Sequence, residues 1–444
     1  MNNLRQQSSV LFGDKLNKSV PAFNQTPFIY LPGTIADGTH VPIPFSTDIL
    51  SKHMMLLGGI GTGKTNALYH LISRLKAKMG ADDVMVIFDT KGDFYREFYR
   101  PGDVVISNDC TATGTGGLDY WNIFNEIDGN GSITDEAALL PNIIEIAKSL
   151  FAEACEKTTQ IFFPNAAKDI FMAILLHFFR AVEPRQRTNQ NLVAFINGVP
   201  AEKMKAMLES YNDLRAMSSY ISNPDSPQTQ GVLSELQQVT REVFLGNFAK
   251  QGTLSIRNLV KNKGGKVVFI EYDLSIGNML KPIYSLLFDL AIKEALGRNR
   301  SEGNVYFICD EFKLLPYLQH IDDAVNFGRS LGIKFVMGIQ NVEQIYDNYG
   351  AERARSIFSG FMTSFCFRVN DAESREFIKG LYGKNMRLDS YLPVMKNKGM
   401  VEETREGYVV EDWDITNLEI GEAIVGIPGR EPFVFRFDLY QERG

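Results

Sequence analysis

Short apolar runs alternate with helical patterns along much of the chain, and this alternation predicts a sheet flanked by helices. Runs at 53–57, 83–88, 266–270, 304–309 and 333–339 have the length of buried strands. Between them, apolar residues recur with the spacing of one helix face, as at 66–79, 278–296 and 321–330. Strands that alternate with helices form mainly parallel sheets, so the predicted fold class is α/β.

The pattern changes in the middle of the chain and at both ends. Residues 183–249 lose the strand pattern and carry short helical segments around a proline loop, which predicts an all-helical inserted domain. Residues 1–50 are polar and punctuated by proline, which is typical of an arm of short strands. Residues 422–437 predict a closing hairpin. The α/β domain would then comprise residues 51–182 and 250–444.

A glycine-rich stretch after the first strand carries the strongest chemical signal. It matches the phosphate-loop pattern at every fixed position and reads Gly58-Gly59-Ile60-Gly61-Thr62-Gly63-Lys64-Thr65. Glycines let the backbone curl so that N–H groups point at phosphate oxygens, and the helix that follows adds its dipole. These residues and Asn66 therefore predict a nucleoside triphosphate site. Lys64 would reach the β- and γ-phosphates, and the Thr65 hydroxyl would bind Mg²⁺.

The strand at 304–309 ends in two adjacent carboxylates, Asp310 and Glu311. The first would hold Mg²⁺ beside Thr65, and the second would orient a water molecule for attack on the γ-phosphate. This pair favours hydrolysis over transfer to a bound hydroxyl group. The alternative to this catalytic interpretation is that the two acids only begin a solvated helix, since acids are favoured in the first turn of a helix. Asp89, which ends the 83–88 strand, is the weaker candidate for the Mg²⁺ acid.

Two further side chains near strand ends fit phosphoryl transfer. Gln340 follows the strand at 333–339, and its amide can hydrogen-bond both the γ-phosphate and the attacking water. Arg329 lies between glycines just before that strand and could stabilise charge on the ATP of a neighbouring subunit. Each signal is weak alone, because most exposed arginines are solvated or pair with acids.

Composition limits the class of protein. The 444 residues are too many for one ordinary core, and contents of 44% hydrophobic and 22% charged residues are typical of a soluble globular protein. A net charge of −7 argues against a uniformly basic nucleic-acid binder but leaves room for a locally basic channel. The four cysteines have no paired spacing, the five histidines form no ligand pattern, and no apolar run reaches membrane-span length. These features predict a cytoplasmic protein.

The order of the motifs resembles the type IV coupling proteins, members of the FtsK/HerA superfamily of RecA-like motors. The similar region runs from about residue 53 to 383. It includes the phosphate loop, Asp89-Thr-Lys-Gly-Asp93, the helical insertion, Asp310-Glu-Phe312, Gly328-Arg-Ser-Leu-Gly-Ile333 and Gly338-Ile-Gln340. The resemblance implies a RecA-like P-loop NTPase domain that assembles as a homohexamer, with the insertion facing the DNA-transfer machinery.

The resemblance also implies roles for single residues. Lys64 and Thr65 would be the Walker A residues, and Asp310 and Glu311 the Walker B pair. Gln340 would be the sensor and Arg329 the arginine finger, with Arg368 in reserve. Family members usually carry N-terminal transmembrane helices, and some have a long acidic tail, which this sequence lacks. Three explanations stay open: the chain is a soluble member, the span was lost or removed, or a separate membrane protein recruits it.

The sequence thus predicts an ATP- and Mg²⁺-dependent motor that moves single-stranded DNA without sequence preference toward a secretion channel. A relaxase or channel proteins would be its partners. The basic segments 185–187 and 257–263 are candidate DNA contacts, although isolated basic runs are usually solvated loops. Two alternatives stay open: a HerA-like DNA translocase that works with a nuclease, and a nucleotide-binding scaffold that docks substrate proteins with little turnover.

Overall fold

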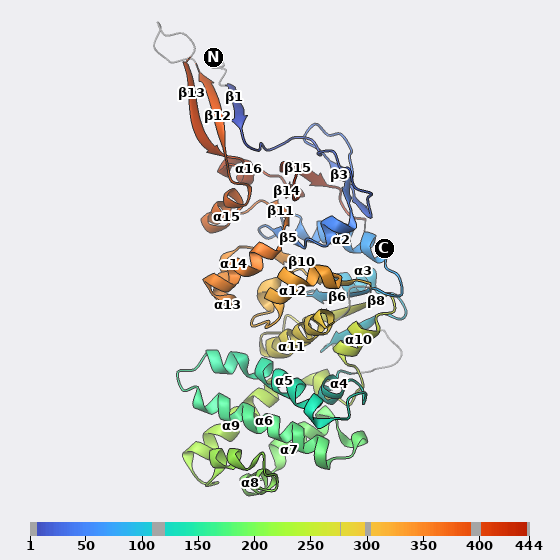
Figure 1. Ribbon diagram of the computed structural model, residues 1–444, viewed down its shortest axis with the longest axis vertical. Helices are drawn as coiled ribbons and strands as arrows, with labels where there is room; N and C mark the ends of the chain where they lie inside the picture. Colours follow the sequence, from blue (N-terminus) through green and yellow to red (C-terminus); the bar gives the residue numbers. More distant parts are fainter. Residues whose placement is uncertain (1–6, 109–119, 276, 298–302, 392–400, 442–444) are drawn as a thin grey trace. The chain divides into compact units, whose positions relative to one another are not determined.

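The chain folds into two compact units. The computed structural model describes residues 7–108, 120–275, 277–297, 303–391 and 401–441. Unit 1 comprises Met1–Met79, Ile308–Lys313 and Lys334–Gly444, and unit 2 comprises Gly80–Phe307 and Leu314–Ile333. Figure 1 labels most of the elements of both units.

The phosphate-loop strand lies inside the sheet of unit 1. Strand β5 (Met54–Leu57) pairs in parallel with β10 (Ile333–Ile339) on one side and with β11 (Thr363–Phe367) on the other. Next to β11 come the antiparallel strands β14 (Glu422–Gly426) and β15 (Phe433–Phe437), which form the predicted closing hairpin, and β3 (Gly33–Thr34). The apolar strands thus place the loop at an inner position of the sheet.

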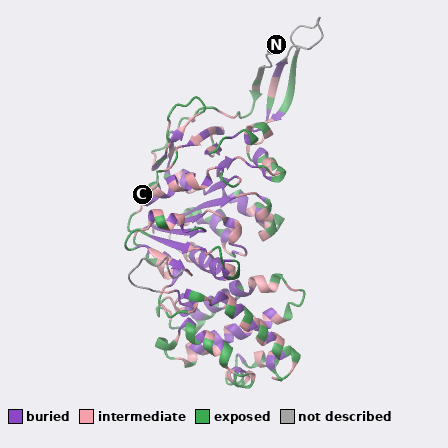
Figure 2. Cartoon of the chain, turned by 180° about the vertical axis from the view of Figure 1, so that it is seen from behind, coloured by how far each residue is buried: buried purple, intermediate pink, exposed green. Residues whose placement is uncertain are grey.

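Unit 2 holds the parallel strands β6 (Val84–Asp89), β8 (Lys266–Glu271) and β7 (Val104–Ser107). The unit boundary passes through β9 (Val305–Cys309), and the ten strands follow the order β3-β15-β14-β11-β5-β10-β9-β6-β8-β7. The strands are mostly buried, as Figure 2 shows. The predicted α/β class with a mainly parallel sheet is confirmed, although the short strand β7 was not predicted.

Helices connect the strands of both units. Those of unit 1 are α1 (Thr47–Leu50), α2 (Lys64–Lys76), α13 (Glu343–Tyr349), α14 (Ala351–Gly360), α15 (Ala372–Tyr382) and α16 (Asp412–Thr416). Those beside the strands of unit 2 are α3 (Asp93–Phe98), α10 (Ile256–Asn262), α11 (Gly277–Leu296) and α12 (Ile321–Phe327). The buried face of α2 carries the spaced apolar residues that predicted this helix.

Between β7 and β8 every described element is helical. These elements are α4 (Ile123–Asp128), α5 (Glu136–Glu156), α6 (Phe162–Ala181), α7 (Asn189–Gly198), α8 (Ala201–Glu209), α9 (Pro227–Val243) and short 3-10 turns. Helix α6 packs against both α5 and α9, so the helical part starts before the predicted boundary at residue 183. The sequence pattern places α5 and α6 in the α/β domain, because an α/β domain also contains amphipathic helices.

Helix α6 is also long and apolar enough, by length and composition, to cross a membrane. However, 56% of its most apolar window is buried inside the structure. Its apolar residues, among them Ile170, Phe171 and Ile174, form the core of the helical part. We therefore interpret α6 as a core helix.

The N-terminal arm contains the expected short strands. β2 (Ile29–Leu31) pairs with β4 (Ile43–Phe45). β1 (Gln7–Phe12) joins an antiparallel hairpin, β12 (Lys384–Tyr391) and β13 (Val401–Tyr408), in a separate three-stranded sheet. This hairpin was not predicted, because residues 401–408 are mostly polar and lack an apolar face.

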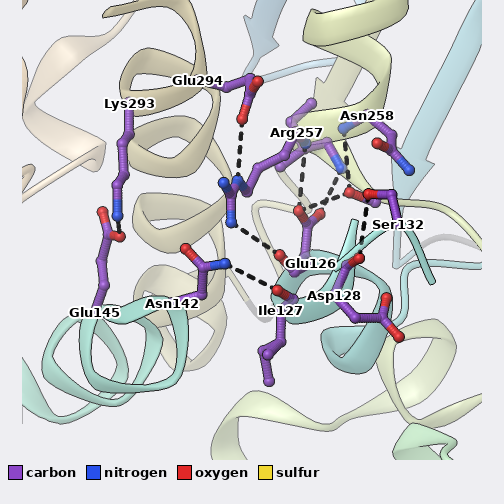
Figure 3. A network of polar contacts seen from close by, with 12 residues as sticks. Glu126, Ile127, Asp128, Ser132, Asn142, Glu145, Arg257, Asn258, Lys293 and Glu294 are labelled. Atoms are coloured by element: carbon purple, nitrogen blue, oxygen red, sulfur yellow. Dashed lines mark hydrogen bonds and ion pairs between the residues drawn. The ribbon is translucent and has the colours of Figure 1, made fainter. Parts of the chain in front are cut away.

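A buried carboxylate joins the helical part to the sheet helices of unit 2 (Figure 3). Glu126 on α4 is fully buried and accepts hydrogen bonds from Trp121 Nε1 at 2.9 Å and from Ser255 Oγ at 2.9 Å. The backbone N–H groups of Ile256 and Arg257, at the start of α10, also donate to it. The Arg257 side chain donates to the carbonyl oxygen of Glu126 and forms an ion pair with Glu294 at 3.2 Å. Such a network holds only when its members are satisfied.

We expect Glu126→Ala to destabilise unit 2 strongly. The substitution leaves several buried donors without an acceptor, and each such donor costs about 1–3 kcal/mol. Urea denaturation followed by circular dichroism should show a lower midpoint than in the wild type. Glu183→Ala is the matched control, because that carboxylate is exposed, and exposed ion pairs contribute little. Equal midpoints for the two variants would contradict this role for Glu126.

Candidate nucleotide-binding site

Both strands that flank β5 hold the phosphate loop through its backbone. The Gly58 N–H donates to the carbonyl oxygen of Ile339, the last residue of β10, at 3.2 Å. The Gly59 N–H donates to the carbonyl oxygen of Arg368, just after β11, at 2.9 Å. The strand ladder therefore continues into the loop on both sides, which fixes the start of its curl.

Close contacts require glycine at two of the fixed loop positions. A Cβ atom on Gly58 would lie 2.6 Å from the Cβ of Phe367. Gly63 has a φ angle of 113°, and a Cβ atom there would lie 2.8 Å from the Cα of Gly421. Gly421 also donates its N–H to the carbonyl oxygen of Thr62 at 2.9 Å, so the closing hairpin supports the loop.

Lys64 begins helix α2 and is buried at the loop. Its Nζ donates to the carbonyl oxygens of Gly58 and Gly59, the latter at 3.0 Å. The Thr62 hydroxyl donates to the Gly59 carbonyl at 2.8 Å. These bonds hold the ammonium group over the loop, where it can meet the phosphates of a nucleotide.

Thr65 and Asp310 come together although they lie 245 residues apart in the sequence. The Thr65 hydroxyl donates to Asp310 Oδ2 at 3.4 Å. A hydroxyl and a carboxylate at this separation can both be ligands of one Mg²⁺ ion, which prefers oxygen ligands. The two residues predicted to hold the ion therefore fit it.

Glu311 and Gln340 form the predicted pair beside them. Gln340 Nε2 donates to Glu311 Oε2, and Lys313 Nζ lies 3.8 Å from Glu311 Oε1. Among the described residues, the buried Oε1 atom has no hydrogen-bond partner. Burial raises the pKa of the Glu311 carboxyl, while the Lys313 ammonium is the largest influence that lowers it. Glu311 therefore offers an open acceptor that a water molecule could use.

The C-terminal segment binds the helix that follows the loop, which the sequence did not reveal. Asn66 Nδ2 donates to the Asp438 carbonyl at 2.8 Å, and the Tyr440 N–H donates to Asn66 Oδ1 at 2.8 Å. The Tyr69 and Tyr440 rings stack with their centroids 5.1 Å apart. No local signal could have found these contacts, because the partners lie more than 370 residues apart.

The weaker Mg²⁺ candidate, Asp89, lies in unit 2 and has a structural role there. It is buried, and its carboxylate accepts the N–H groups of Tyr95 at 2.8 Å and Lys91 at 3.3 Å. Burial raises the pKa of this carboxyl to about 6. Both carboxylate oxygens thus bind the turn that leads into α3.

Arg329 also lies in unit 2, in the 3-10 turn Gly328–Leu331, and its side chain is exposed. Its predicted function as a finger for a neighbouring subunit stays a prediction. The predicted residues that the structure brings together are those of unit 1: Lys64, Thr65, Asp310, Glu311 and Gln340.

One side-chain cluster in unit 2 departs from the expectation that the histidines form no ligand group. Glu145, Asp289 and His320 bring potential ligand atoms within 4.8 Å of one another. His320 Nε2 lies 2.7 Å from Glu145 Oε1, and Lys293 also forms an ion pair with Glu145 (Figure 3). Because an ammonium group already neutralises Glu145, we interpret the cluster as an ion-pair network between α5 and α11.

Comparison with known proteins places this arrangement among characterised relatives. A family model described as the type IV secretion-system coupling protein DNA-binding domain matches residues 38–430. The coupling protein TraD of Escherichia coli K12 is 24% identical over 416 residues, which cover 90% of this chain and 54% of TraD. The coupling protein VirD4 of Bartonella henselae is 23% identical over 231 residues, which cover 49% of this chain and 36% of VirD4. The chain thus spans about half the length of TraD, and its match to VirD4 is shorter.

Solved structures of another coupling protein have the same fold. The unbound bacterial conjugative coupling protein TrwBdeltaN70 superimposes with a TM-score of 0.73 at 20% identity, covering 99% of this chain and 95% of that one. TrwB in complex with the ATP analogue ADPNP gives a TM-score of 0.72 at 19% identity, covering 100% and 96%. These likenesses agree with the predicted α/β sheet and helical part.

We expect Asp310→Asn, but not Asp89→Asn, to weaken Mg²⁺ binding at the site. Asp310 faces the Thr65 hydroxyl, whereas the Asp89 carboxylate binds its own backbone turn. Mg²⁺ titrations in the presence of ADPNP should show a loss of about tenfold or more for Asp310→Asn only, as expected when an ion loses a charged ligand. A similar loss in both variants would contradict the assignment.

We also expect Asp89→Asn to remove a pH-dependent part of the stability. The folded chain holds the Asp89 proton up to about pH 6, against an ordinary pKa of 3.8. Since the unfolded chain releases this proton first, the wild type loses about 3 kcal/mol as the pH rises through this window. Thermal unfolding between pH 4 and 7 should show this fall in the wild type and not in the variant. Parallel curves for the two proteins would disprove it.

Proposed function

Because the chain belongs to the type IV secretion-system coupling proteins, we propose that it is an ATP-hydrolysing motor that moves DNA toward a conjugation or type IV secretion channel. One observation carries the hydrolytic part of this proposal. Glu311 presents a buried oxygen without a hydrogen-bond partner among the described residues, beside Gln340 and next to the acid that faces Thr65. Such an acceptor next to the proposed Mg²⁺ ligands suits a water molecule that attacks the γ-phosphate.

The nucleotide would bind through the loop backbone and Lys64. TrwB, which shares the fold, has been solved with ADPNP and with ADP and Mg²⁺. In this chain, Thr65 and Asp310 would hold Mg²⁺, which when bound neutralises charge on the β- and γ-phosphates. The loop N–H groups and the start of α2 would orient the triphosphate against the sheet edge.

The hydrolytic step would depend on positioning. Glu311 Oε1 would accept a hydrogen bond from a water molecule and orient it in line with the γ-phosphate. Gln340 holds the other carboxylate oxygen and so fixes the plane of the Glu311 carboxylate. The ammonium of Lys313, 3.8 Å away, favours the ionised form of Glu311 that this role requires.

Membership of the family supports the proposed DNA and protein partners. The matched family model is described as a DNA-binding domain, which supports DNA as the moving partner. A homohexameric ring in the cytoplasm, anchored through a membrane protein and serving a relaxase or channel proteins, would place Arg329 at a neighbouring ATP. Phosphate contacts without base recognition suit a single strand moved through such a ring.

Two arginines of the predicted basic segments lie beside acids of their own chain. Arg257 is largely buried in its ion pair with Glu294, which argues against a phosphate contact by this side chain. Arg185 is exposed and lies 2.9 Å from Glu183. The matches to coupling proteins favour transfer over a HerA-like translocase that works with a nuclease.

We expect Glu311→Gln to bind ATP normally and to hydrolyse it at least 100-fold more slowly, because the amide cannot polarise water as a carboxylate does. ATPase assays with and without single-stranded DNA should show stimulation in the wild type only. Glu343→Gln, which changes another acid of unit 1, in the first turn of α13, is the control. Unchanged turnover in Glu311→Gln would refute the catalytic role of Glu311, whereas a wild type with little turnover would favour the scaffold alternative.

We expect Arg329→Ala to bind ATP normally and to lose turnover by about 10³-fold, the range for an arginine finger. In mixtures with Lys64→Ala, the finger of one variant can complete the intact site of the other. Activity should therefore return in mixed assemblies. Normal hydrolysis by assembled Arg329→Ala would show that another residue supplies the charge.

A further inference from the structure

Arg368 lies beside the phosphate loop of its own chain. Strand β11 pairs with β5 in parallel, with Cys366 opposite Leu57. Two residues farther along, the Arg368 carbonyl accepts the Gly59 N–H at 2.9 Å. The backbone of Arg368 is therefore fixed next to the loop within one compact unit.

The neighbouring contacts leave the Arg368 backbone little freedom. Phe367 packs so closely on Gly58 that a Cβ atom there would lie 2.6 Å away. Cys366 and Phe367 are fully buried, which anchors the end of β11. An arginine held in this way is positioned by the sheet itself, and side chains on rigid elements are placed more accurately than side chains on loops.

The Arg368 side chain differs from several arginines of the same unit. It is partly exposed, and the structure shows no hydrogen bond or ion pair of its guanidinium with any described residue. Other arginines of the unit bind carboxylates, namely Arg375 with Asp412, Arg387 with Glu411, Arg405 with Asp389 and Arg436 with Glu419. A cation without a carboxylate partner at the edge of a phosphate loop suits an anionic ligand.

We infer that Arg368 contacts the triphosphate bound by its own chain, as a phosphate-binding residue that acts in cis. The inference rests on the proposed nucleotide site and adds a residue to it. Two side chains would then flank the P-loop strand β5. Gln340 follows β10 on one side of it, and Arg368 follows β11 on the other side. A guanidinium group can donate two parallel hydrogen bonds to phosphate oxygens, which a lysine ammonium cannot do in the same geometry.

This assignment changes the expectation that Arg368 is a reserve finger for a neighbouring subunit. A finger that acts in trans has to lie away from the nucleotide of its own chain. The bond between Gly59 and Arg368 places this arginine at its own phosphate loop. The trans role is then left to Arg329 in the proposed ring.

Nucleotide binding gives the first test. Calorimetric titration of the full chain with ADPNP and Mg²⁺ should show affinity at least tenfold weaker for Arg368→Ala, with partial recovery in Arg368→Lys. Arg355→Ala, which removes an exposed arginine on α14, should bind as the wild type does. If Arg368→Ala does not fold, as judged by circular dichroism, Arg368→Lys and Arg368→Gln provide the comparison. Equal affinity of the folded Arg368 variants and the wild type would overturn the inference.

Mixed assemblies separate cis from trans action. Arg368→Ala mixed with Lys64→Ala on single-stranded DNA should have no more ATPase activity at any ratio than Arg368→Ala alone, because the Arg368 of the Lys64→Ala chain cannot complete the site of its neighbour. Recovery of ATPase activity would show that Arg368 acts in trans and would overturn the inference. A wild type that binds ADPNP but hydrolyses no ATP would refute the motor, while the affinity comparison would still decide the role of Arg368.

Discussion

The backbone hydrogen bonds from the phosphate loop to the strands on both sides of β5 are the constraint on which the rest of the site depends. The loop can curl around an anion only if its N–H groups keep their direction when no ligand is present. The bonds from Gly58 to Ile339 and from Gly59 to Arg368 provide this rigidity. They also bring the strand ends, and the side chains that follow them, next to the loop. The site is therefore built on the carboxyl ends of neighbouring strands rather than on a flexible loop.

Charge balance at this edge follows from the same arrangement. Asp310 and Glu311 are adjacent, and their mutual repulsion in a buried setting would disfavour ionisation of both. The Lys313 ammonium, 3.8 Å from Glu311, and the amide of Gln340 offset this effect. Thr65 faces Asp310, so the two carboxylates point to different partners. One acid is thereby prepared for a metal ion and the other for a water molecule.

Contacts between distant parts of the chain complete each unit. In unit 1, the C-terminal segment binds Asn66 and stacks Tyr440 on Tyr69, so the last residues of the chain support the helix that starts at the loop. In unit 2, Glu126 satisfies donors from α10 and so ties the helical part to the sheet helices. Both sets of contacts use buried polar groups, which would destabilise the fold if they were left without hydrogen-bond partners.

The sequence by itself determined the phosphate loop and most of the parallel strands, because apolar period and motif spacing are local signals. That Asp310 and Glu311 act with Lys64 was predicted from the roles of the two motifs in phosphoryl transfer, and not from a local pattern. It missed the polar hairpin of β12 and β13, and it assigned α5 and α6 to the α/β frame. Only the tertiary structure decided that Asp89 caps a turn, that Asn66 binds the C-terminal segment and that Arg368 lies at its own loop. These facts depend on which strand ends become neighbours, and residues far apart in the chain carry no local sign of that pairing.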